Sequence, residues 1–589
     1  MCGIFAYLGA RPGAAQIVLE GLKRLEYRGY DSWGIAAPHA GRAVLERHVG
    51  KISLAETTLP ATHVALGHTR WATHGGVTRR NAHPHLDCHG RIALIHNGII
   101  ENHRALRAEI DAGEHRFRSS TDTEVVAHLI EEKLAAGIPL MRATIEVFRR
   151  LEGLNAIAVL EVATGAVAAA KSGSPLVLGW GDEANLMASD AAALIPHTRR
   201  VTFLEDGQAA LIERAGIQIF DVATGDPLAP RIETVDWDAG DDTTGGHKHY
   251  MSKEIREQPA VLRRLAVAEG ALDELAQALA QAGPVLLTGC GSAFHAALAG
   301  TYYFSRLAGR LTHAIAASEL PYRLGPPGTP AGPPPWLIAV SQSGETIDVL
   351  DAVRAARARG MKIAAITNVQ GSSLFRQADI PVNIGAGPER AVLATKTFTA
   401  QVTALAQVAW RLAGRADEGR LAVERAANAC DAVISAQGRC IGLAARIHTA
   451  KSLLVLGRGL SYPAAMEAAL KVKEVSYIHA EGFASGELKH GVIALVETGT
   501  PCLIFAPRDE TFAAAVSGAM EVKARGALTL GLSPADDPAF DARLDVTDCG
   551  DLTLLPQTVA SQLLAYHLAV LRGCDPDKPR NLAKCVTVR

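Results

Sequence analysis

Short apolar runs separated by turn residues dominate the first part of the chain. Three of these runs span residues 92–95, 156–160 and 209–212, and Gly, Asp or Asn residues interrupt the chain between such runs. Runs of this length with turn residues at their ends are typical of β-strands. The pattern predicts an α+β domain with layered sheets over residues 2–235.

A different pattern begins near residue 284. Apolar strands such as 285–288 end in Gly- and Ser-rich turns and are followed by Ala-rich helices. This alternation predicts a parallel α/β sheet. A second copy begins at 453–456, and Gly-x-Gly recurs at 289 and 457. The recurrence indicates two α/β lobes with parallel sheets, although a chance likeness of two short Gly-rich segments remains the alternative.

Changes in composition place the boundaries of these parts. A polar stretch rich in Gly and Asp predicts a linker at 236–248. The two lobes are then expected at 249–435 and 436–575, and the Pro-rich stretch 326–335 is expected to be a loop of the first lobe. The patterned tail, 576–589, is expected to dock on the folded protein.

Composition excludes several classes of partner. The 589 residues include 59 Lys and Arg against 61 Asp and Glu, a net charge of -2, so neither nucleic acid nor membrane is an expected partner. Every apolar run is shorter than a membrane span, and the N-terminus lacks the basic region of a secretion signal. Nine cysteines without a Cys-x-x-Cys pair favour a cytoplasmic protein.

The second residue, Cys2, is a candidate nucleophile. Removal of Met1 would leave a thiol and a free α-amine on one residue, and an amine with a pKa near 8 can accept the proton of the thiol. The alternative is that Cys2 is a small apolar residue at the start of a strand. Further motifs decide between the two interpretations.

Five motifs follow Cys2 through the first 235 residues. In chain order they are Arg28-Gly29-Tyr30-Asp31-Ser32, His68-Thr69-Arg70-Trp71-Ala72-Thr73-His74-Gly75, His83-Pro84-His85, His96-Asn97-Gly98 and Ser120-Thr121-Asp122-Thr123-Glu124. With Cys2, this set resembles the glutamine amidotransferase domain that uses an N-terminal cysteine.

The resemblance implies a role for each of these residues. Cys2 would attack the side-chain amide of glutamine, and the Asn97 amide with the Gly98 N–H would bind the resulting oxyanion. Glutamine binding is expected at Arg28, Arg70, Trp71, Thr73, His74 and Asp122. Within that set, Arg70 suits the α-carboxylate and Asp122 the α-ammonium group, while Trp71, Thr73 and His74 resemble a closing flap.

No metal or cofactor is expected. Eight histidines lie between residues 63 and 103, but they lack a compact ligand spacing with acidic or cysteine partners.

A hydroxyl-rich loop marks a second site. Residues 341–346 read Ser-Gln-Ser-Gly-Glu-Thr, between an expected strand at 337–340 and an expected helix at 348–359. Hydroxyl groups and free N–H groups at a helix N-terminus can bind a phosphate. The alternative is an ordinary Ser or Thr N-cap. A nucleotide-binding P-loop is absent from the sequence.

Acid and base groups gather in the second lobe, in the segments 469–481 and 486–491. Together with the tail at 580–589, they resemble the sugar isomerase (SIS) domains of the isomerizing glutamine:fructose-6-phosphate aminotransferase family. This resemblance covers essentially the whole chain. It implies that His490 opens the sugar ring, that Glu474 moves a proton between C1 and C2 with Lys471 in the same pocket, and that Lys584 forms a Schiff base at C2.

The same resemblance assigns the phosphate contacts. They are expected at Ser292, Ser341, Gln342, Ser343 and Thr346, with 389–397 as a further wall. The implied reaction converts L-glutamine and fructose 6-phosphate to glutamate and glucosamine 6-phosphate in a homodimer, as the first step of hexosamine synthesis, with ammonia passing between the sites. Ala293 and Ala394 stand where the family carries hydroxyl residues. Two alternatives therefore stay open: a paralogue that aminates another keto-sugar phosphate, and a regulator that only senses sugar phosphates.

Overall fold

Two compact units make up the chain. The computed structural model describes residues 2–110, 115–236, 243–326 and 332–587. One unit consists of Met1–Asp241 with Ala583–Arg589, and the other of Asp242–Leu582. Part of the expected linker, 237–242, and part of the Pro-rich stretch, 327–331, lie outside the described residues.

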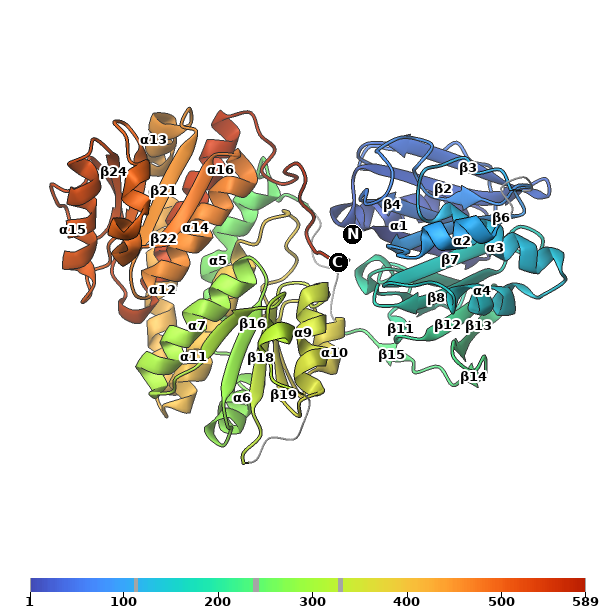
Figure 1. Cartoon of the computed structure of the whole chain (residues 1–589), viewed down its shortest axis with the longest axis horizontal. Helices are drawn as coiled ribbons and strands as arrows, with labels where there is room; N and C mark the ends of the chain where they lie inside the picture. The colour runs from blue at the N-terminus through green and yellow to red at the C-terminus, as the bar shows by residue number, and fades with distance from the viewer. Residues whose placement is uncertain (1, 111–114, 237–242, 327–331, 588–589) are drawn as a thin grey trace. The chain divides into compact units, whose positions relative to one another are not determined.

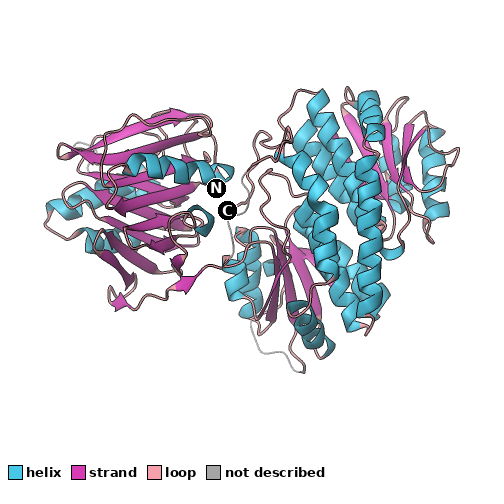
Figure 2. Cartoon of the chain, turned by 180° about the vertical axis from the view of Figure 1, so that it is seen from behind, coloured by secondary structure: helices cyan, strands magenta, loops and turns pink. Residues whose placement is uncertain are grey.

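Two antiparallel sheets form the centre of the N-terminal unit (Figures 1 and 2). The first has eight strands, in the order β15 (Glu233–Thr234), β11 (Arg200–Phe203), β9 (Val177–Trp180), β10 (Ala184–Ala188), β1 (Gly3–Gly9), β4 (Val64–Arg70), β2 (Ser32–His39) and β3 (Arg42–Val49). The second has seven, in the order β14 (Pro227–Leu228), β13 (Gly216–Asp221), β12 (Gln208–Glu213), β8 (Val167–Ser172), β7 (Asn155–Glu161), β6 (Ile92–Gly98) and β5 (His85–Leu86).

Successive side chains of strand β1 are buried on opposite faces of the eight-stranded sheet. Along β1, Ile4, Ala6 and Leu8 belong to the core between the sheets, whereas Phe5 and Tyr7 belong to the core that includes α1 (Ala14–Arg24). This alternation follows from the two-residue period of a strand. The buried positions on both faces explain why β1 is apolar without interruption.

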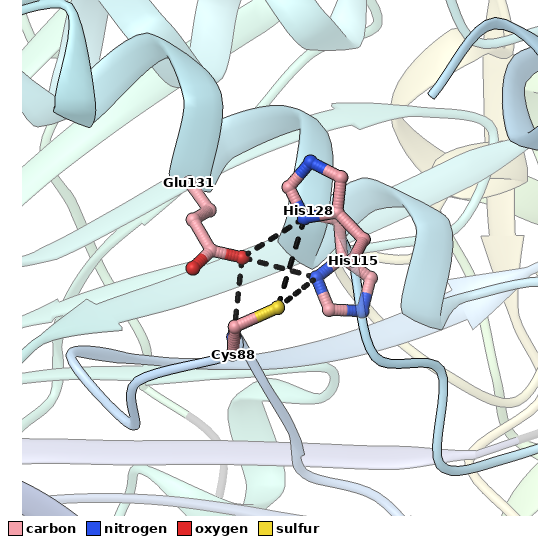
Figure 3. A group of neighbouring side chains, drawn as sticks. All are labelled: Cys88, His115, His128 and Glu131. Atoms are coloured by element: carbon pink, nitrogen blue, oxygen red, sulfur yellow. Dashed lines mark hydrogen bonds and ion pairs between the residues drawn. The ribbon is translucent and has the colours of Figure 1, made fainter. Parts of the chain in front are cut away.

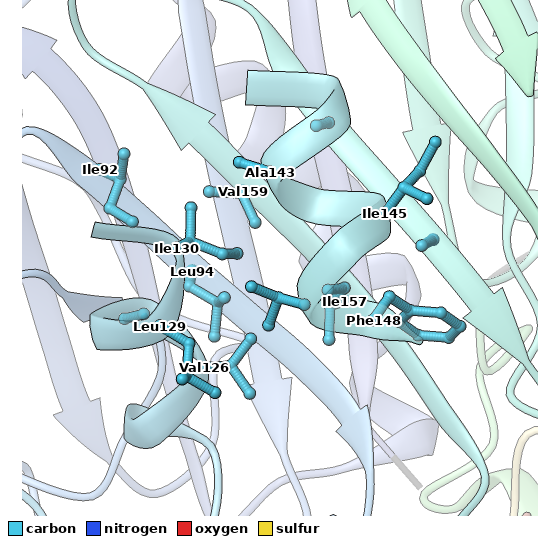
Figure 4. Packing of buried hydrophobic residues seen from close by; sticks show 14 of the residues in the cluster. Ile92, Leu94, Val126, Leu129, Ile130, Ala143, Ile145, Phe148, Ile157 and Val159 are labelled. Carbon is cyan, nitrogen blue, oxygen red and sulfur yellow. The ribbon is translucent and has the colours of Figure 1, made fainter. Parts of the chain in front are cut away.

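Helices α3 (Glu124–Ala135) and α4 (Leu140–Phe148) cover the other face of the seven-stranded sheet (Figure 4). Their apolar side chains pack against alternate residues of β6 and β7, among them Leu94 and Ile157. A short helix, α2 (His103–Glu109), precedes α3. The unit is therefore a layered α+β domain, as the sequence predicts.

Two five-stranded parallel sheets organise the second unit. The first lobe has the order β17 (His313–Ala316), β16 (Val285–Gly289), β18 (Trp336–Ser341), β19 (Lys362–Thr367) and β20 (Ile380–Asn383). The second lobe has the order β22 (His479–Ala484), β21 (Ser452–Gly457), β23 (Pro501–Phe505), β24 (Leu528–Ser533) and β25 (Ala542–Asp545). In each sheet the second strand in sequence lies at the edge beside the first, and the third, fourth and fifth strands follow on the other side of the first. The two lobes therefore share one strand order, which confirms the duplication predicted from the sequence.

Helices connect and cover these strands. They are α5 (Tyr250–Ala266), α6 (Ala271–Ala280), α7 (Ser292–Ala308), α8 (Leu320–Arg323), α9 (Ile347–Arg357), α10 (Ser373–Gln377), α11 (Lys396–Leu412), α12 (Ala416–Ser435), α13 (Gly438–Ile447), α14 (Ser461–Ser476), α15 (Phe512–Lys523) and α16 (Leu554–Leu571). The segment Gly550–Leu571 is long and apolar enough to cross a membrane, but 83% of its apolar 18-residue window is buried in the protein. It is a core helix, and it lies beside α14 (Figure 1).

Candidate functional site

Cys2 lies immediately before β1, in the middle of the eight-stranded sheet. Strand β4 runs antiparallel to β1 with Thr69 opposite Gly3, which brings the residues after β4 next to Cys2. The backbone N–H of Trp71 donates to Sγ of Cys2 at 3.2 Å. Burial raises the pKa of the Cys2 thiol, while this N–H and the Arg70 guanidinium act to lower it. The thiol therefore needs a base before it can act as a nucleophile.

Asn97 and Gly98 end strand β6, in the neighbouring sheet. Nδ2 of Asn97 donates to the backbone oxygen of Cys2 at 2.9 Å, so the amide lies beside the thiol-bearing residue. Gly98 has a φ of +131°, and a Cβ there would lie 2.1 Å from the backbone oxygen of Leu154. Only glycine fits this backbone path.

Arg70 and Asp122 are buried near Cys2. The Arg70 guanidinium donates to the carbonyl oxygens of His74, Gly75 and Gly76. Burial lowers the pKa of Arg70, and the charges of Cys2 and Asp122 oppose that shift. Oδ2 of Asp122 accepts from the N–H of Ile100 at 2.8 Å. Arg70 thus lies within electrostatic reach of both the Cys2 thiol and the Asp122 carboxylate.

The remaining residues expected at the glutamine site differ in exposure. Trp71 is half-buried and packs edge-on against Tyr30, with ring centroids 5.4 Å apart. Thr73 is exposed, and His74 is half-buried with its ring 5.3 Å from that of His103. Arg28 is buried in an ion pair with Asp190 at 3.3 Å.

The motifs by themselves indicate no role for His68, although it belongs to one of them. Its Nε2 lies 3.0 Å from Oδ1 of Asn97. Burial lowers the pKa of His68 to about 3, so the ring is neutral at physiological pH. The sequence pattern of the strand can indicate that His68 is buried, but it cannot indicate that His68 contacts Asn97 of another strand.

A second cluster forms between the two lobes of the other unit. Glu467, Lys471 and Glu474 share one face of α14, because residues four and seven apart align on a helix. Nζ of Lys471 lies 2.7 Å from Oε2 of Glu474 and 3.3 Å from Oε1 of Glu467. From the first lobe, Oγ of Ser292 accepts from Lys471 at 2.9 Å and donates to Glu467 at 2.8 Å.

Opposite charges control ionisation in this cluster. Burial by itself would lower the pKa of Lys471, but Glu467 and Glu474 outweigh it and the pKa is raised. Burial also raises the pKa of Glu474, and Lys471 opposes that shift. Nδ1 of His295 lies 2.9 Å from the second oxygen of Glu467. Glu467 and His295 were not predicted from the sequence, although the helical spacing of Glu467 from Lys471 was a usable signal.

The hydroxyl-rich loop lies at the same edge of the first lobe as Ser292. Strands β16 and β18 are parallel neighbours; Ser292 follows the first and Ser341 ends the second. Oγ of Ser341 accepts from the N–H of Gly344 at 3.0 Å, and Oγ of Ser343 accepts from that of Glu345 at 3.1 Å. Ligands bind at such an edge, where the strand order reverses.

Other residues expected at the sugar site are placed as follows. Gln342 and Thr346 belong to the loop between β18 and α9, and Thr346 is the N-cap of α9. Glu389 is buried, and its Oε1 accepts from the N–H groups of Thr395 and Thr397 at 2.9 and 3.1 Å. Ala293 lies in the first turn of α7, and Ala394 lies in the wall that Glu389 fixes.

Two further expected catalytic residues lie on other segments of the chain. His490 is exposed at the end of the short helix Ser485–His490. Lys584 is half-buried in the tail segment Ala583–Arg589, which groups with the N-terminal unit.

Comparisons with known proteins identify a family for each unit of the chain. The glutamine amidotransferase domain family matches residues 53–215, and the SIS domain family matches 278–411 and 446–542. Among curated proteins, the glutamine--fructose-6-phosphate aminotransferase [isomerizing] of Aeropyrum pernix is 44% identical, and that of Thermus thermophilus is 41% identical, each over the full length of both chains.

A solved structure is similar to the second unit. The C-terminal domain of glucosamine-fructose-6-phosphate aminotransferase from Francisella tularensis matches with a TM-score of 0.53 and 30% identity. The match covers 57% of this chain and 100% of that one.

Proposed function

The chain belongs to the family of isomerizing glutamine--fructose-6-phosphate aminotransferases, so it transfers the amide nitrogen of glutamine to fructose 6-phosphate. We propose which residues carry out each of the two half-reactions. The observation that carries the division is the presence of one reactive cluster in each unit, around Cys2 and around Lys471. Glutamine is cleaved at the first and the sugar is aminated at the second.

At the first cluster, the α-amine freed by removal of Met1 takes the proton of the Cys2 thiol. The thiolate attacks the side-chain carbon of glutamine, and Asn97 with the Gly98 N–H holds the oxyanion. Ammonia leaves, and water hydrolyses the thioester to glutamate. Arg70 binds the α-carboxylate and Asp122 the α-ammonium group. Because Arg70 also holds the carbonyls of residues 74–76, glutamine binding is coupled to the position of the segment that contains Trp71, Thr73 and His74.

At the second cluster, Lys584 condenses with the C2 ketone of the sugar, and ammonia displaces it. His490 opens the ring, and Glu474 moves a proton between C1 and C2. The raised pKa of Glu474 suits a group that must both accept and give up a proton. Lys471 stays protonated between two carboxylates, so it positions Glu474 and is a poor amine nucleophile.

The phosphate of the sugar binds at the loop between β18 and α9. Its contacts are the hydroxyls of Ser341, Ser343 and Thr346, the side chain of Gln342, and Ser292 at the edge. The tail caps this site and ammonia passes to it without release to solvent. The protein acts as a cytoplasmic homodimer at the first step of hexosamine synthesis.

Both alternatives are less well supported. A regulator that only senses sugar phosphates has no need of Cys2, Glu474 and Lys584 together. A paralogue for another keto-sugar would be consistent with Ala293 and Ala394, but full-length relatives at 38–44% identity carry the fructose-6-phosphate name.

Isotope transfer tests the whole assignment. The enzyme is incubated with glutamine labelled with ¹⁵N in the amide and with fructose 6-phosphate, and the amino sugar is identified by mass spectrometry. We expect labelled glucosamine 6-phosphate, mature protein that starts at Cys2, and loss of glutamine hydrolysis in Cys2→Ala with sugar binding retained. Full activity with Met1 still attached would contradict the role of the α-amine.

Reductive trapping tests Lys584. Borohydride in the presence of fructose 6-phosphate should add the mass of the sugar to the tail peptide of the wild type and of Lys578→Arg, a control in the same tail. Lys584→Arg should abolish both the adduct and synthesis, because arginine keeps the charge but is not an amine nucleophile. Near-normal synthesis by Lys584→Arg would remove this residue from the mechanism.

A further inference from the structure

Four side chains of metal-binding type converge in the N-terminal unit (Figure 3). They are Cys88, His115, His128 and Glu131, and their ligand atoms all lie within 4.8 Å of one another. Cys88 lies in the turn between β5 and β6, His115 precedes α3, and the other two are i and i+3 on α3. No metal site is expected from the histidines between 63 and 103, but three of these four ligands come later in the chain, so the spacing of those histidines could not indicate this cluster.

The distances fit one tetrahedral ion. Sγ of Cys88 lies 3.7 Å from Nδ1 of His115 and 3.6 Å from Nδ1 of His128. Oε2 of Glu131 lies 3.3 and 3.1 Å from the same two nitrogens. Around tetrahedral zinc, with bonds of about 2.0 to 2.3 Å, ligand atoms are spaced about 3.3 to 3.6 Å apart. The side chains are already close to the arrangement that a bound ion would require.

The atoms behind these ligands also suit a metal. Nε2 of His115 lies 3.1 Å from Oε1 of Glu132, the carboxylate–histidine arrangement that orients a ring for metal binding. The N–H of Arg116 donates to Sγ of Cys88 at 3.4 Å, which stabilises a thiolate. The His128 side chain is fully buried, and those of His115 and Glu131 are 8% and 7% exposed.

We propose that Cys88, His115, His128 and Glu131 bind one Zn²⁺ ion that stabilises the N-terminal unit. Thiolate, imidazole and carboxylate together favour zinc among the divalent metals, and one thiolate with one carboxylate balances its charge. Four protein ligands leave no open position, so the ion is structural and not catalytic.

The ion would join three segments that are distant in sequence. It would tie the turn at Cys88 and the segment at His115 to the middle of α3. Glu124, in the first turn of α3, already accepts from the N–H groups of Arg118 and Ser119 at 2.6 Å each. Zinc would therefore fix His115 to α3, and Glu124 fixes Arg118 and Ser119 to the first turn of the same helix.

Metal content of the full-length, tag-free protein tests the site directly. The protein is incubated with zinc chloride, desalted, and analysed by mass spectrometry for metals. We expect about one zinc per chain in the wild type and in the control variants His39→Gln and Cys574→Ser, and far less in His128→Gln and Cys88→Ser. His39 is an exposed residue of the same unit, and Cys574 lies in the other unit. Zinc well below one per chain in the wild type, or equal in all variants, would overturn the proposal.

Two measurements avoid dependence on variants that fold poorly. On the wild type, zinc should slow alkylation of the peptide containing Cys88 by iodoacetamide, but not that of the peptide containing Cys574. Cobalt in place of zinc should give a sulfur-to-metal charge-transfer band. Glu132→Gln, which keeps all four ligands, should weaken zinc binding about 10- to 100-fold. Unchanged alkylation of Cys88 or a cobalt spectrum without the band would contradict a site at these residues.

Discussion

His68 fixes the orientation of the Asn97 amide, with its Nε2 3.0 Å from Oδ1. Since Nδ2 of Asn97 donates to the backbone oxygen of Cys2, Oδ1 must be the acceptor and Nε2 of His68 must carry the proton. Nε2 also lies 3.0 Å from the backbone oxygen of His96, which can share the same proton. The neutral ring is thus held in one tautomer, and it sets the direction in which Asn97 presents its N–H groups.

Replacing His68 should impair turnover of glutamine more than its binding. In His68→Ala we expect kcat for glutamate release to fall about 10- to 100-fold with a smaller change in KM, because the oxyanion donor loses its orientation. His68→Gln, which can still donate to Oδ1, should recover part of the loss. His63→Ala, at an exposed position of the same unit, is the control. A change confined to KM would show that His68 acts on binding.

Acid should destabilise the N-terminal unit through its buried histidines. Burial lowers the pKa of His68 to about 3 and lowers those of His83, His85 and His96 as well. Below about pH 6.5 the unfolded chain binds protons that the folded chain does not, so stability falls as pH falls. Each of these histidines can remove up to ~1.4 kcal/mol per pH unit in that range.

Urea unfolding at pH 7 and pH 5 checks this expectation. Pulsed hydrogen exchange in peptides from β4 and β6 should report a lower urea midpoint at pH 5. Peptides from β18 and β19 of the other unit provide an internal comparison. Equal midpoints for β4 and β6 at the two pH values would mean that these histidines are protonated without cost in the folded protein.

Removing the charge of Glu474 should separate the two half-reactions. In Glu474→Gln we expect glutamine hydrolysis to persist and amino-sugar synthesis to fall at least about 100-fold, since proton transfer between C1 and C2 loses its carrier. Exchange of the C1 proton with deuterated water is the direct measurement. Glu497→Gln, at an exposed position of the same lobe, is the matched control. Normal exchange in Glu474→Gln would assign the proton transfer to another group.

Gly344 should be essential for the phosphate loop. Its φ is +66°, and an added Cβ would lie 2.0 Å from Oγ of Ser372. Gly344→Ala must therefore move the loop, and we expect KM for fructose 6-phosphate to rise about 10-fold or more while glutamine hydrolysis is retained. Gly438→Ala serves as control, because a Cβ at that position meets open space. Unchanged KM would place the phosphate elsewhere.

Several strands and their order along the chain could be predicted from the local sequence pattern. The runs at 285–288, 337–340 and 453–456 are β16, β18 and β21, and the hydroxyl-rich loop follows β18 as expected. These features are local: a period of two or of 3.6 residues, and the residues that end a strand, are written in consecutive positions. The motifs for glutamine and sugar chemistry were likewise visible as short strings.

Which side chains meet depends on the packing of elements that are distant in sequence. Ser292 and Glu467 are 175 residues apart in sequence, and their hydrogen bond depends on how α7 packs against α14 across the two lobes. His68 reaches Asn97 from a different sheet, and Cys88 meets His128 only because α3 covers the sheet that contains β5 and β6. A sequence pattern indicates which face of a helix or strand is buried. It does not indicate which other helix or strand packs against that face, and that packing fixes the contacts between side chains.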